Sequence, residues 1–491
     1  MTEQYFSKFR KGIIGVDQDI PTPWGLKKMI YADWVASGRF YVPIEETILN
    51  KLAPYCANTH SETSLTGTIM TRSYHESKRY IKKEVNANDD DILIFSGSGM
   101  TDSVNKLQRL LGLRIPEKLQ NFLKPFSRKI ESERPIVFVT HLEHHSNHTS
   151  WVETLADVEI IHPDKEGYVD LSHFAQLLEK YKNRPYKIAS VSACSNVTGI
   201  FTPYYQIAEM IHDAGGLCFV DFACSAPYVE INMCPENKKQ HLDVIFISPH
   251  KFLGGPGTPG IMVLNKNICN NSIPDNSGGG TVKFTSPWQM HEYIDNIEER
   301  EDGGTPPFMQ GIKAALCFKL KKEMGVDKIL HREKIMVHRL LDKLSTISNV
   351  HVLASNLRHR VGAISFYIDH LHFNLGVRLL NDYFGLQVRG GCACAGTYGH
   401  YLLNIDKETS AKIINRIREG ELFVRPGWIR LSIHPTHTDQ EIDTILEAIE
   451  YVAKNHLELA KNYSYNPSSN SFFNNNFNHN FEEHFIKDIF Q

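Results

Sequence analysis

Two short apolar runs, each leading into a polar side chain, constrain the fold of this chain more than any other feature. Leu217–Val220 leads into Asp221, and Val244–Ile247 leads into the segment Ser248–Lys251. Such short apolar runs are typical of strands buried on both faces of a parallel sheet. Polar groups just past the carboxyl ends of these strands meet at the edge where open α/β sheets bind ligands. The sequence therefore predicts a mostly parallel α/β fold with Asp221 and Lys251 at its ligand-binding edge.

An acid and a lysine in these positions predict pyridoxal phosphate as the cofactor. That cofactor needs an amine to form a Schiff base and a carboxylate to keep its pyridine nitrogen protonated. Lys251 and Asp221 are the candidates. Taken singly, Asp221 could cap the following segment and Lys251 could be one solvated lysine among many. Their occurrence as a pair, in this spacing, favours the cofactor.

A glycine-containing turn supplies a candidate phosphate site. Ser96–Gly99 follows an apolar run and precedes a helical pattern that places Val104 and Leu107 inward. Free backbone amides and the helix dipole at such a turn favour a dianion. The lysine of a Walker loop is missing and the dinucleotide glycine pattern is not met, which disfavours nucleotide binding. Ser248 and His250 could add phosphate donors, although the turn alone could be merely tight.

Composition indicates a large intracellular enzyme that acts on a small molecule. The 491 residues with 42% hydrophobic content can bury more than one core, and no run of about eighteen apolar residues suits a membrane. The net charge is −3 without a basic cluster, so we expect neither a nucleic-acid nor a membrane partner. Nine cysteines without a framework suggest reduced thiols. With no leader pattern at the start, the expected location is cytoplasmic.

The pattern of elements predicts two domains. Alternating strands and helices place a large domain at 31–324, and a helix-rich stretch with later strands places a smaller α+β domain at 325–462. Residues 1–30 form an N-terminal segment expected to pack on the small domain. The asparagine-rich end, 463–491, is expected to be disordered. The stretch 112–135 interrupts the alternation and is expected to be a surface insertion without chemistry.

A histidine cluster, His141–His148, suggests zinc at first sight. Its spacing does not match a His-Glu-x-x-His motif, and it directly follows a predicted strand. A histidine in this place can instead stack on an aromatic cofactor. We therefore expect no metal.

Together these motifs resemble the class V aminotransferase superfamily, and within it the cysteine desulfurase and selenocysteine lyase group. The resemblance covers about Tyr31 to Lys454. The matching segments occur in the family's order and are Glu143–Asn147, Ser195–Gly199, Val220–Asp221, Ser248–Lys251 and Arg389–Cys394.

The resemblance implies a fold-type I homodimer with active sites at the subunit interface. It implies that Lys251 carries the cofactor, Asp221 meets the ring nitrogen, His144 stacks on the ring and Asn196 lies near the ring hydroxyl. It also implies phosphate contacts from Thr101, Ser248, His250 and, across the interface, Thr305. Arg430 matches the substrate-carboxylate arginine, where a planar guanidinium can grip a carboxylate through two parallel hydrogen bonds. Arg389 is a second candidate for substrate binding.

Within this family Cys394 matches the sulfur-accepting cysteine. The expected reaction removes sulfur from L-cysteine to give alanine, with a persulfide on Cys394 and a possible sulfur-acceptor protein as partner. Three departures bear on this expectation. Cys224 stands where desulfurases usually have glutamine, Cys392 could compete with Cys394, and the stretch 397–426 is longer than in common desulfurases.

Several alternatives stay open. One is another class V chemistry, such as an aminotransferase, an epimerase, or a selenocysteine or β-lyase, in which Lys251 works without a thiol. Another is a noncatalytic dimeric scaffold, which the intact Lys251, Asp221 and Asn196 argue against. Cys392 and Cys394 could also be a surface, redox or metal pair.

Overall fold

The computed structural model describes residues 2–119, 133–477 and 480–491. Residues 120–132, in the expected surface insertion, lie outside the described part. The described chain forms two compact units. Unit 1 contains residues 1–35, 196–200 and 328–491, and unit 2 contains residues 36–195 and 201–327. The amino-terminal segment therefore belongs to the same unit as the carboxyl-terminal third of the chain.

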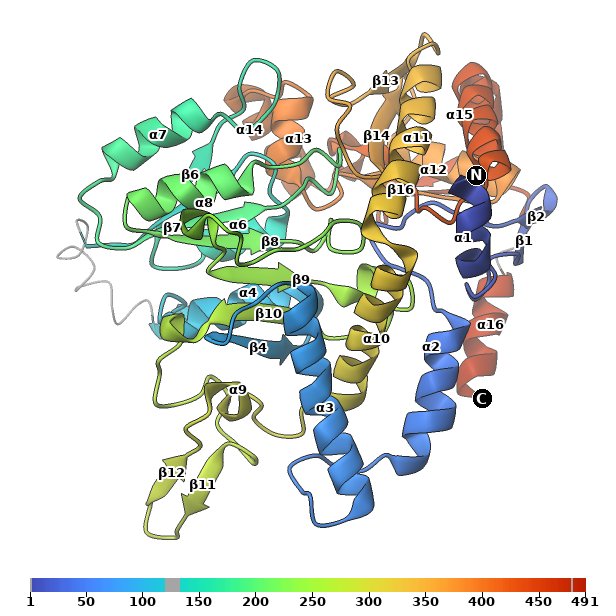
Figure 1. Ribbon diagram of the computed structural model, residues 1–491. Helices are drawn as coiled ribbons and strands as arrows, with labels where there is room; N and C mark the ends of the chain where they lie inside the picture. Colours follow the sequence, from blue (N-terminus) through green and yellow to red (C-terminus); the bar gives the residue numbers. More distant parts are fainter. Residues whose placement is uncertain (1, 120–132, 478–479) are drawn as a thin grey trace. The chain divides into compact units, whose positions relative to one another are not determined.

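Unit 2 is built on a seven-stranded sheet (Figure 1). The strand order is β4 (Asp91–Ser96), β10 (Gly260–Asn265), β9 (Val244–Ile247), β8 (Leu217–Asp221), β7 (Lys187–Ser192), β5 (Ile136–Thr140) and β6 (Asp157–Ile161). Neighbours from β9 to β6 pair in parallel, whereas β10 runs antiparallel to both β4 and β9. The predicted mostly parallel fold is confirmed, and both apolar runs that flank the acid and the lysine are strands.

Helices cover both faces of this sheet because successive side chains of a strand point in opposite directions. In β5, Val137 and Val139 join a core cluster that contains Trp151 of the helix α6 (His145–Val152). Phe138, between them, packs edge-on against Phe174 at 5.4 Å. Burying such side chains stabilises the fold by roughly 1.5–3 kcal/mol each. The helices of this unit are α2 (Val42–Thr47), α3 (Leu65–Glu84), α4 (Gly99–Leu110), α6, α7 (Leu171–Lys180), α8 (Tyr204–Asp213), α9 (Ile297–Arg300) and α10 (Phe308–Met324). A hairpin of β11 (Val282–Thr285) and β12 (His291–Tyr293) completes it.

Unit 1 contains a four-stranded antiparallel sheet in the order β13 (Val350–Val352), β14 (Ala363–Ile368), β17 (Trp428–Ser432) and β16 (Arg389–Gly391). Its core joins this sheet to three helices, α11 (Val326–Leu344), α12 (Phe373–Phe384) and α15 (Asp439–Leu459). The apolar stripe of α15, including Ile442, Ile445 and Ile449, is fully buried. The long stretch after the cysteines folds into α13 (Gly396–Leu402) and α14 (Lys407–Arg418).

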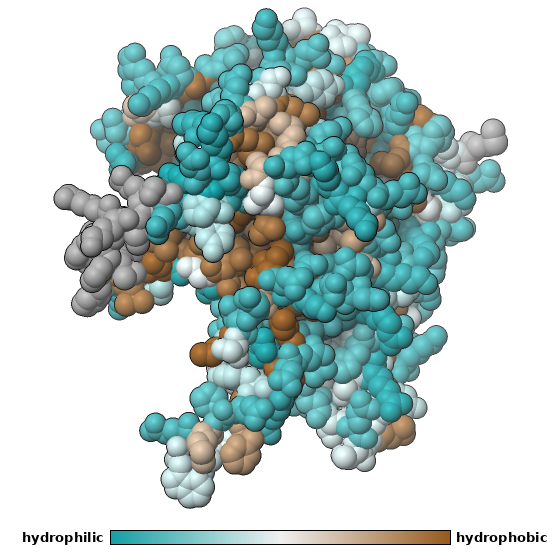
Figure 2. Space-filling view, turned by 60° about the vertical axis from the view of Figure 1, so that its left-hand side comes forward, coloured by the Kyte–Doolittle hydropathy of each residue, from teal (hydrophilic) through white to brown (hydrophobic). Residues whose placement is uncertain are grey.

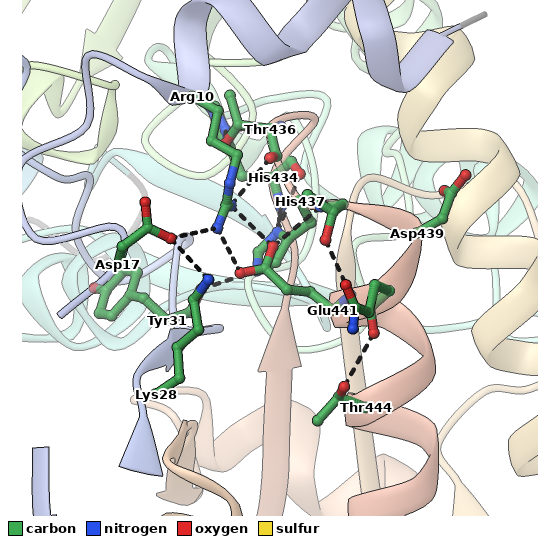
Figure 3. A network of polar contacts seen from close by, with 12 residues as sticks. Arg10, Asp17, Lys28, Tyr31, His434, Thr436, His437, Asp439, Glu441 and Thr444 are labelled. Atoms are coloured by element: carbon green, nitrogen blue, oxygen red, sulfur yellow. Dashed lines mark hydrogen bonds and ion pairs between the residues drawn. The ribbon is translucent and has the colours of Figure 1, made fainter. Parts of the chain in front are cut away.

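The amino-terminal segment is fastened to unit 1 by charged contacts (Figure 3). It forms α1 (Thr2–Arg10), the hairpin β1 (Asp19–Thr22) and β2 (Gly25–Lys28), and β3 (Ile30–Tyr31), which pairs in parallel with β15 (Leu386–Gln387). The Arg10 guanidinium donates to both carboxylate oxygens of Glu441, at 2.9 and 2.8 Å. Asp17 pairs with Lys28 at 2.7 Å. These contacts fix the start of the chain, and with it the residues that follow β3.

The tail beyond residue 462, expected to be disordered, contains a hairpin of β18 (Tyr463–Asn466) and β19 (Ser471–Asn474) and the helix α16 (Asn480–Phe490). Tyr463 donates to Asp382 at 2.9 Å, and Tyr465 packs on Phe472 with ring centroids 5.1 Å apart. The difference arises because aromatic residues, dispersed among the asparagines, find an apolar surface to cover.

Among the described helices, none is both long and apolar enough to cross a membrane. The face of the molecule in Figure 2 is largely hydrophilic, with hydrophobic side chains gathered in smaller patches near the middle of the view. Some exposed apolar surface of this kind is normal for globular proteins.

Candidate active site

The carboxyl edge of the unit 2 sheet brings Asp221 and Lys251 close enough to influence one another. Asp221 is the last residue of β8, and Lys251 ends a short 3₁₀ turn, Pro249–Lys251, just past β9. Burial raises the pKa of the Asp221 carboxyl to about 7, while the Ala223 amide and the nearby Lys251 charge favour the ionised form. The Ala223 amide donates to Asp221 Oδ1 at 2.7 Å. A buried carboxyl poised near neutrality suits a partner that brings its own positive charge.

The turn before α4, the predicted phosphate site, lies next to the residues that follow β9. Ser248 Oγ accepts from the Met100 amide at 2.9 Å, which ties the β9 end to the first turn of α4. Gly99 has φ +63°, and a Cβ there would lie only 3.0 Å from the His250 ring and 3.1 Å from Ser248 Oγ. Glycine is therefore required by both backbone conformation and space. The amino-terminal end of α4, where backbone amides and the helix dipole favour an anion, thus lies next to Ser248 and His250.

Thr101 and His144 are joined through Ser146, which sequence reasoning did not assign to the site. Ser146 Oγ lies 2.6 Å from Thr101 Oγ1, and the Ser146 amide donates to His144 Nδ1 at 3.1 Å. Since Nδ1 of His144 accepts, the neutral ring carries its proton on Nε2. Burial lowers the pKa of His250 to about 4, helped by Lys251, so this ring is neutral at pH 7. His250 can thus contribute a hydrogen bond to an anion but no charge.

Glu143 is a second residue near the site to which the sequence pattern assigned no role. Its buried carboxylate accepts from Thr140 Oγ1 at 2.6 Å, Asn147 Nδ2 at 2.7 Å and Ser192 Oγ at 2.6 Å. These bonds connect the ends of β5 and β7 with α6 and fix the turn that presents His144. Burial raises the pKa of Glu143, although its hydrogen bonds oppose that shift. The only hint in the sequence was the position of Glu143, which lies among histidines just after a predicted strand.

Unit 1 holds the predicted arginine pair, and an acid that the sequence analysis missed binds both. Arg389 and Arg430 are directly opposite one another on β16 and β17. Asp33 Oδ1 accepts from Arg430 Nη2 at 2.7 Å, and Asp33 Oδ2 accepts from Arg389 Nε at 3.0 Å. Like charges opposite each other on two strands repel, so this carboxylate stabilises the pair. The only hint of Asp33 in the sequence was that an acid directly follows the short apolar run Met29–Ala32.

Asn196 connects Arg430 to the predicted cysteine loop. Arg430 Nη1 donates to the Asn196 carbonyl oxygen at 3.1 Å, and Asn196 Nδ2 donates to the Ala393 carbonyl oxygen at 2.7 Å. Ala393 and Cys394 have φ of +51° and +58°, in the left-handed region that residues other than glycine rarely adopt. Cys394 is exposed and Cys392 is partly buried. A strained turn thus presents the predicted sulfur acceptor to solvent.

Two buried polar atoms beside this turn lack a partner. Arg430 Nε and Asn196 Oδ1 have no hydrogen-bond partner within the described parts of the chain. Unpaired buried polar atoms are costly and often mark a place where a ligand binds. One donor and one acceptor are therefore available next to the arginine pair.

The remaining expected site residues are placed as follows. Thr305 is exposed in the loop between α9 and α10 and, in the portion of the chain that is described, has no hydrogen-bond partner. Cys224 is buried, with its Sγ 3.7 Å from the Ser195 carbonyl oxygen, so it packs beside the strand ends. His141 is also buried, and burial lowers its pKa to about 4.

A separate cluster of His212, His241 and Asp243 has metal-ligand residue types. The two rings stack with centroids 4.2 Å apart and planes 9° apart, and their Nε2 atoms lie 2.8 and 3.0 Å from the two Asp243 oxygens. Lone pairs of parallel rings in separate planes cannot converge on one ion as tetrahedral zinc requires. We interpret the cluster as a structural one, in which hydrogen bonds to Asp243 connect α8 to the start of β9.

The chain belongs to the family described as aminotransferase class V, whose model matches residues 30–445. This family consists of pyridoxal phosphate-dependent enzymes, and the chain is such an enzyme. Relatives include a probable cysteine desulfurase of Pyrococcus abyssi, 26% identical, with 90% of this chain and 97% of the relative covered. A probable cysteine desulfurase of Halalkalibacterium halodurans is 25% identical, with 75% and 84% covered.

Solved structures show the same fold. A cysteine desulfurase of Thermococcus onnurineus matches with TM-score 0.72 and 24% identity over 91% of this chain and 98% of that one. A cysteine desulfurase of Escherichia coli matches with TM-score 0.68 and 18% identity over 92% and 98%. These likenesses establish the fold-type I architecture that the sequence motifs predicted.

The residues of unit 2 fit pyridoxal phosphate. A dianion suits the amides of α4 with Thr101 and Ser248, a protonated pyridine nitrogen suits the buried Asp221, and an aldehyde carbon suits the Lys251 amine. Met100 and Ser146 hold two of these residues in place, since the Met100 amide donates to Ser248 Oγ and Ser146 Oγ lies 2.6 Å from Thr101 Oγ1.

The raised pKa of Asp221 predicts a pH-dependent stability of the cofactor-free protein. A carboxyl whose pKa is higher in the folded than in the unfolded state stabilises the fold below pH 4, and this contribution is lost as pH rises towards 7. Asp221→Asn should therefore make the cofactor-free protein more stable than wild type at pH 8, by ~2–4 kcal/mol at about 1.4 kcal/mol per pKa unit. Urea unfolding at pH 5 and pH 8 measures this difference. Equal stability of the two proteins at both pH values would contradict the assignment.

Proposed function

We propose that this enzyme is a cysteine desulfurase that converts L-cysteine to alanine and leaves the sulfur on Cys394 as a persulfide. The observation that carries the proposal is one continuous chain of hydrogen bonds in unit 1. It runs from Arg430 to the Asn196 backbone and from the Asn196 side chain to Ala393, the residue before Cys394. A group suited to a substrate carboxylate and a thiol suited to its sulfur are thus held by the same asparagine.

When bound, pyridoxal phosphate supplies an electron sink for the substrate's α-carbon. Asp221 would stabilise a positive charge at the ring nitrogen, and the neutral His250 and the α4 amides would hold the phosphate. Lys251 would bind the cofactor and then carry a proton from the α-carbon. Arg430 and Arg389 would bind the substrate carboxylate through charge-assisted hydrogen bonds.

The sulfur transfer balances without an added oxidant. The Cys394 thiolate attacks the substrate sulfur, a new S–S bond forms, and the substrate C–S bond breaks. The electron pair of that bond remains with the carbon fragment, which takes up a proton and leaves as alanine. A thiol on a partner protein or a small reductant then removes the outer sulfur from Cys394. The exposure of Cys394 suits this second transfer.

A panel of amino acids tests the proposed activity. The purified holoenzyme should release sulfide and alanine in equal amounts from L-cysteine in the presence of a thiol reductant. Keto acid in place of alanine would identify an aminotransferase, and pyruvate with ammonia and sulfide would identify a β-lyase. Turnover of selenocysteine but not of cysteine would identify a selenocysteine lyase. Any of these three outcomes would overturn the proposal.

We also propose that the enzyme acts as a homodimer. Thr305 is exposed and follows Gly303 and Gly304 in a loop of unit 2, where it is free to complete the phosphate site of a second copy. Light scattering at assay concentration should report twice the chain mass of 56.0 kDa. Thr305→Ala should loosen cofactor binding without changing that mass. An active monomer would contradict this proposal.

A further inference from the structure

Asp33 sets the charge of the carboxylate site in unit 1. Its two oxygens bind the two arginines separately, with Arg430 Nη2 at 2.7 Å and Arg389 Nε at 3.0 Å. The Arg430 side chain is 3% exposed, whereas that of Arg389 is 47% exposed. One carboxylate thus neutralises one of two guanidinium charges, and the group retains a single positive charge. A net charge of this size matches one substrate carboxylate.

The backbone holds Asp33 in this position. The Ser432 amide donates to the Ala32 carbonyl oxygen at 2.7 Å, and Asp33 pairs with Ser432 in an isolated parallel bridge. Because side chains alternate along a strand, Ser432 and Arg430 lie on the same face of β17. Ser432 Oγ also accepts from the Val35 amide at 3.1 Å. Asp33 is therefore fixed over the arginines by main-chain contacts on either side of it.

The buried polar atoms that remain without a partner among the described residues determine which ligand groups the arginine site can bind. Arg430 Nε is buried and has no partner in the described chain, which leaves one edge of the guanidinium for a carboxylate oxygen. Asn196 Oδ1, likewise buried and without a partner there, offers an acceptor beside it. Once one ligand carboxylate is bound, that carboxylate and Asp33 together balance the two guanidinium charges, so a second negative group on the ligand finds no positive charge left at this site. Unfavourable electrostatics of this kind are a common means of excluding wrong ligands.

We propose that Asp33 is a specificity-determining residue that restricts this enzyme to amino acids with a single negative group and excludes those with an acidic side chain. This inference rests on the proposed function, because it takes the arginine pair as the substrate-carboxylate site. It adds the substrate class: α-amino acids whose side chain is uncharged, as in L-cysteine, and not those that carry a second carboxylate or a sulfinate.

The test compares binding of L-alanine and L-aspartate, which differ by one carboxylate. Dissociation constants are measured on the holoenzyme by visible-absorbance titration and by calorimetry. Wild type should bind alanine more tightly than aspartate. Asp33→Asn should shift the ratio of the two constants towards aspartate by about tenfold or more, because the site then carries two uncompensated positive charges. An unchanged ratio in Asp33→Asn, or a wild type that binds aspartate as well as alanine, would overturn the proposal.

Two further variants separate the effect of the Asp33 charge from other effects of the substitution. Asp33→Glu keeps the charge, so its ratio should stay near that of wild type even if both ligands bind more weakly. Asp17→Asn removes an acid of the same unit that pairs with Lys28 and Arg10 (Figure 3) rather than with Arg389 or Arg430, and its ratio should equal that of wild type. A ratio shifted equally in Asp17→Asn and Asp33→Asn would show a nonspecific charge effect and refute the role of Asp33.

If Asp33→Asn does not fold, the exposed Arg389 provides the test. Arg389→Gln leaves Asp33 and Arg430 as a neutral pair, so the ratio should move about tenfold further against aspartate. No change in that ratio would overturn the proposal. Neither ligand contains sulfur, so the binding test is independent of sulfide release. A protein that discriminates as expected but releases no sulfide would refute the desulfurase activity alone.

Discussion

Lys251→Ala should yield a protein that lacks the visible absorbance of bound cofactor and has lost turnover by roughly a thousandfold or more. The side chain is expected both to bind the cofactor and to carry the α-proton, and removal of a general base alone costs about 10²–10⁴ in rate. In wild type, borohydride reduction should attach the pyridoxyl group to Lys251, and a peptide map should locate it there. Lys251 ends the short turn after β9, close enough to the buried Asp221 to influence its charge.

Lys266 provides the matched control for this experiment. It lies in the same unit, where its Nζ pairs with Asp90 at 2.6 Å, and its side chain is 48% exposed. Lys266→Ala should retain colour, cofactor content and turnover. A pyridoxyl group found on a lysine other than Lys251, or substantial turnover in Lys251→Ala, would show that the cofactor lysine has been assigned incorrectly.

The central sheet was predictable because its strands are buried on both faces. Leu217–Val220 and Val244–Ile247 contain little but apolar residues, so pattern and structure agree, and both runs lie in β8 and β9. The antiparallel insertion of β10 between β4 and β9 had no such signal, because an apolar strand reads the same in either direction. Strand order depends on contacts between residues far apart in the chain, and periodicity does not contain that information.

The neighbourhood of Asp221, Lys251 and the turn before α4 was also largely predictable. Asp221 ends β8, Ser248 and Lys251 come just after β9, and the turn comes just after β4, so their position at one sheet edge follows from topology. Ser146 was not predicted because its role depends on a side-chain contact with Thr101, which lies 45 residues away in the sequence. Such contacts require the fold to be known first.

The acid that binds the two arginines, by contrast, could not be predicted from the sequence. Asp33 is 397 residues from Arg430 in sequence, and the two meet only because the segment after β3 pairs beside β17. A lone acid in a short segment near the start of the chain gives no pattern that distinguishes it from a solvated residue. The hairpin at 463–474 was not predicted either. The asparagine-rich composition indicated disorder, whereas the aromatic residues within it pack against one another.

Cys394→Ala should abolish both sulfide release from L-cysteine and the protein-bound persulfide, while the cofactor spectrum and substrate binding remain. The reason is that only a thiolate at this position is expected to draw the sulfur from the substrate, whereas Lys251, Asp221 and the arginines are untouched. The turn itself should survive, because alanine already occupies the left-handed conformation at the preceding Ala393. Persulfide is measured by mass spectrometry after incubation with cysteine, and binding by absorbance titration.

Cys392→Ala is the matched comparison, since Cys392 lies in the same loop but is partly buried. It should retain most of the sulfide release, because the sulfur in transit must reach solvent and an acceptor, and exposed Cys394 is the thiol that can pass it on. Selenocysteine cleavage should survive either substitution, since selenium leaves more readily than sulfur and does not need to be drawn off by a thiolate. Full activity of Cys394→Ala towards cysteine would refute the thiol mechanism and favour a lyase or aminotransferase that relies on Lys251 alone. Loss of activity in Cys392→Ala with retention in Cys394→Ala would instead show that the partly buried Cys392 is the sulfur acceptor.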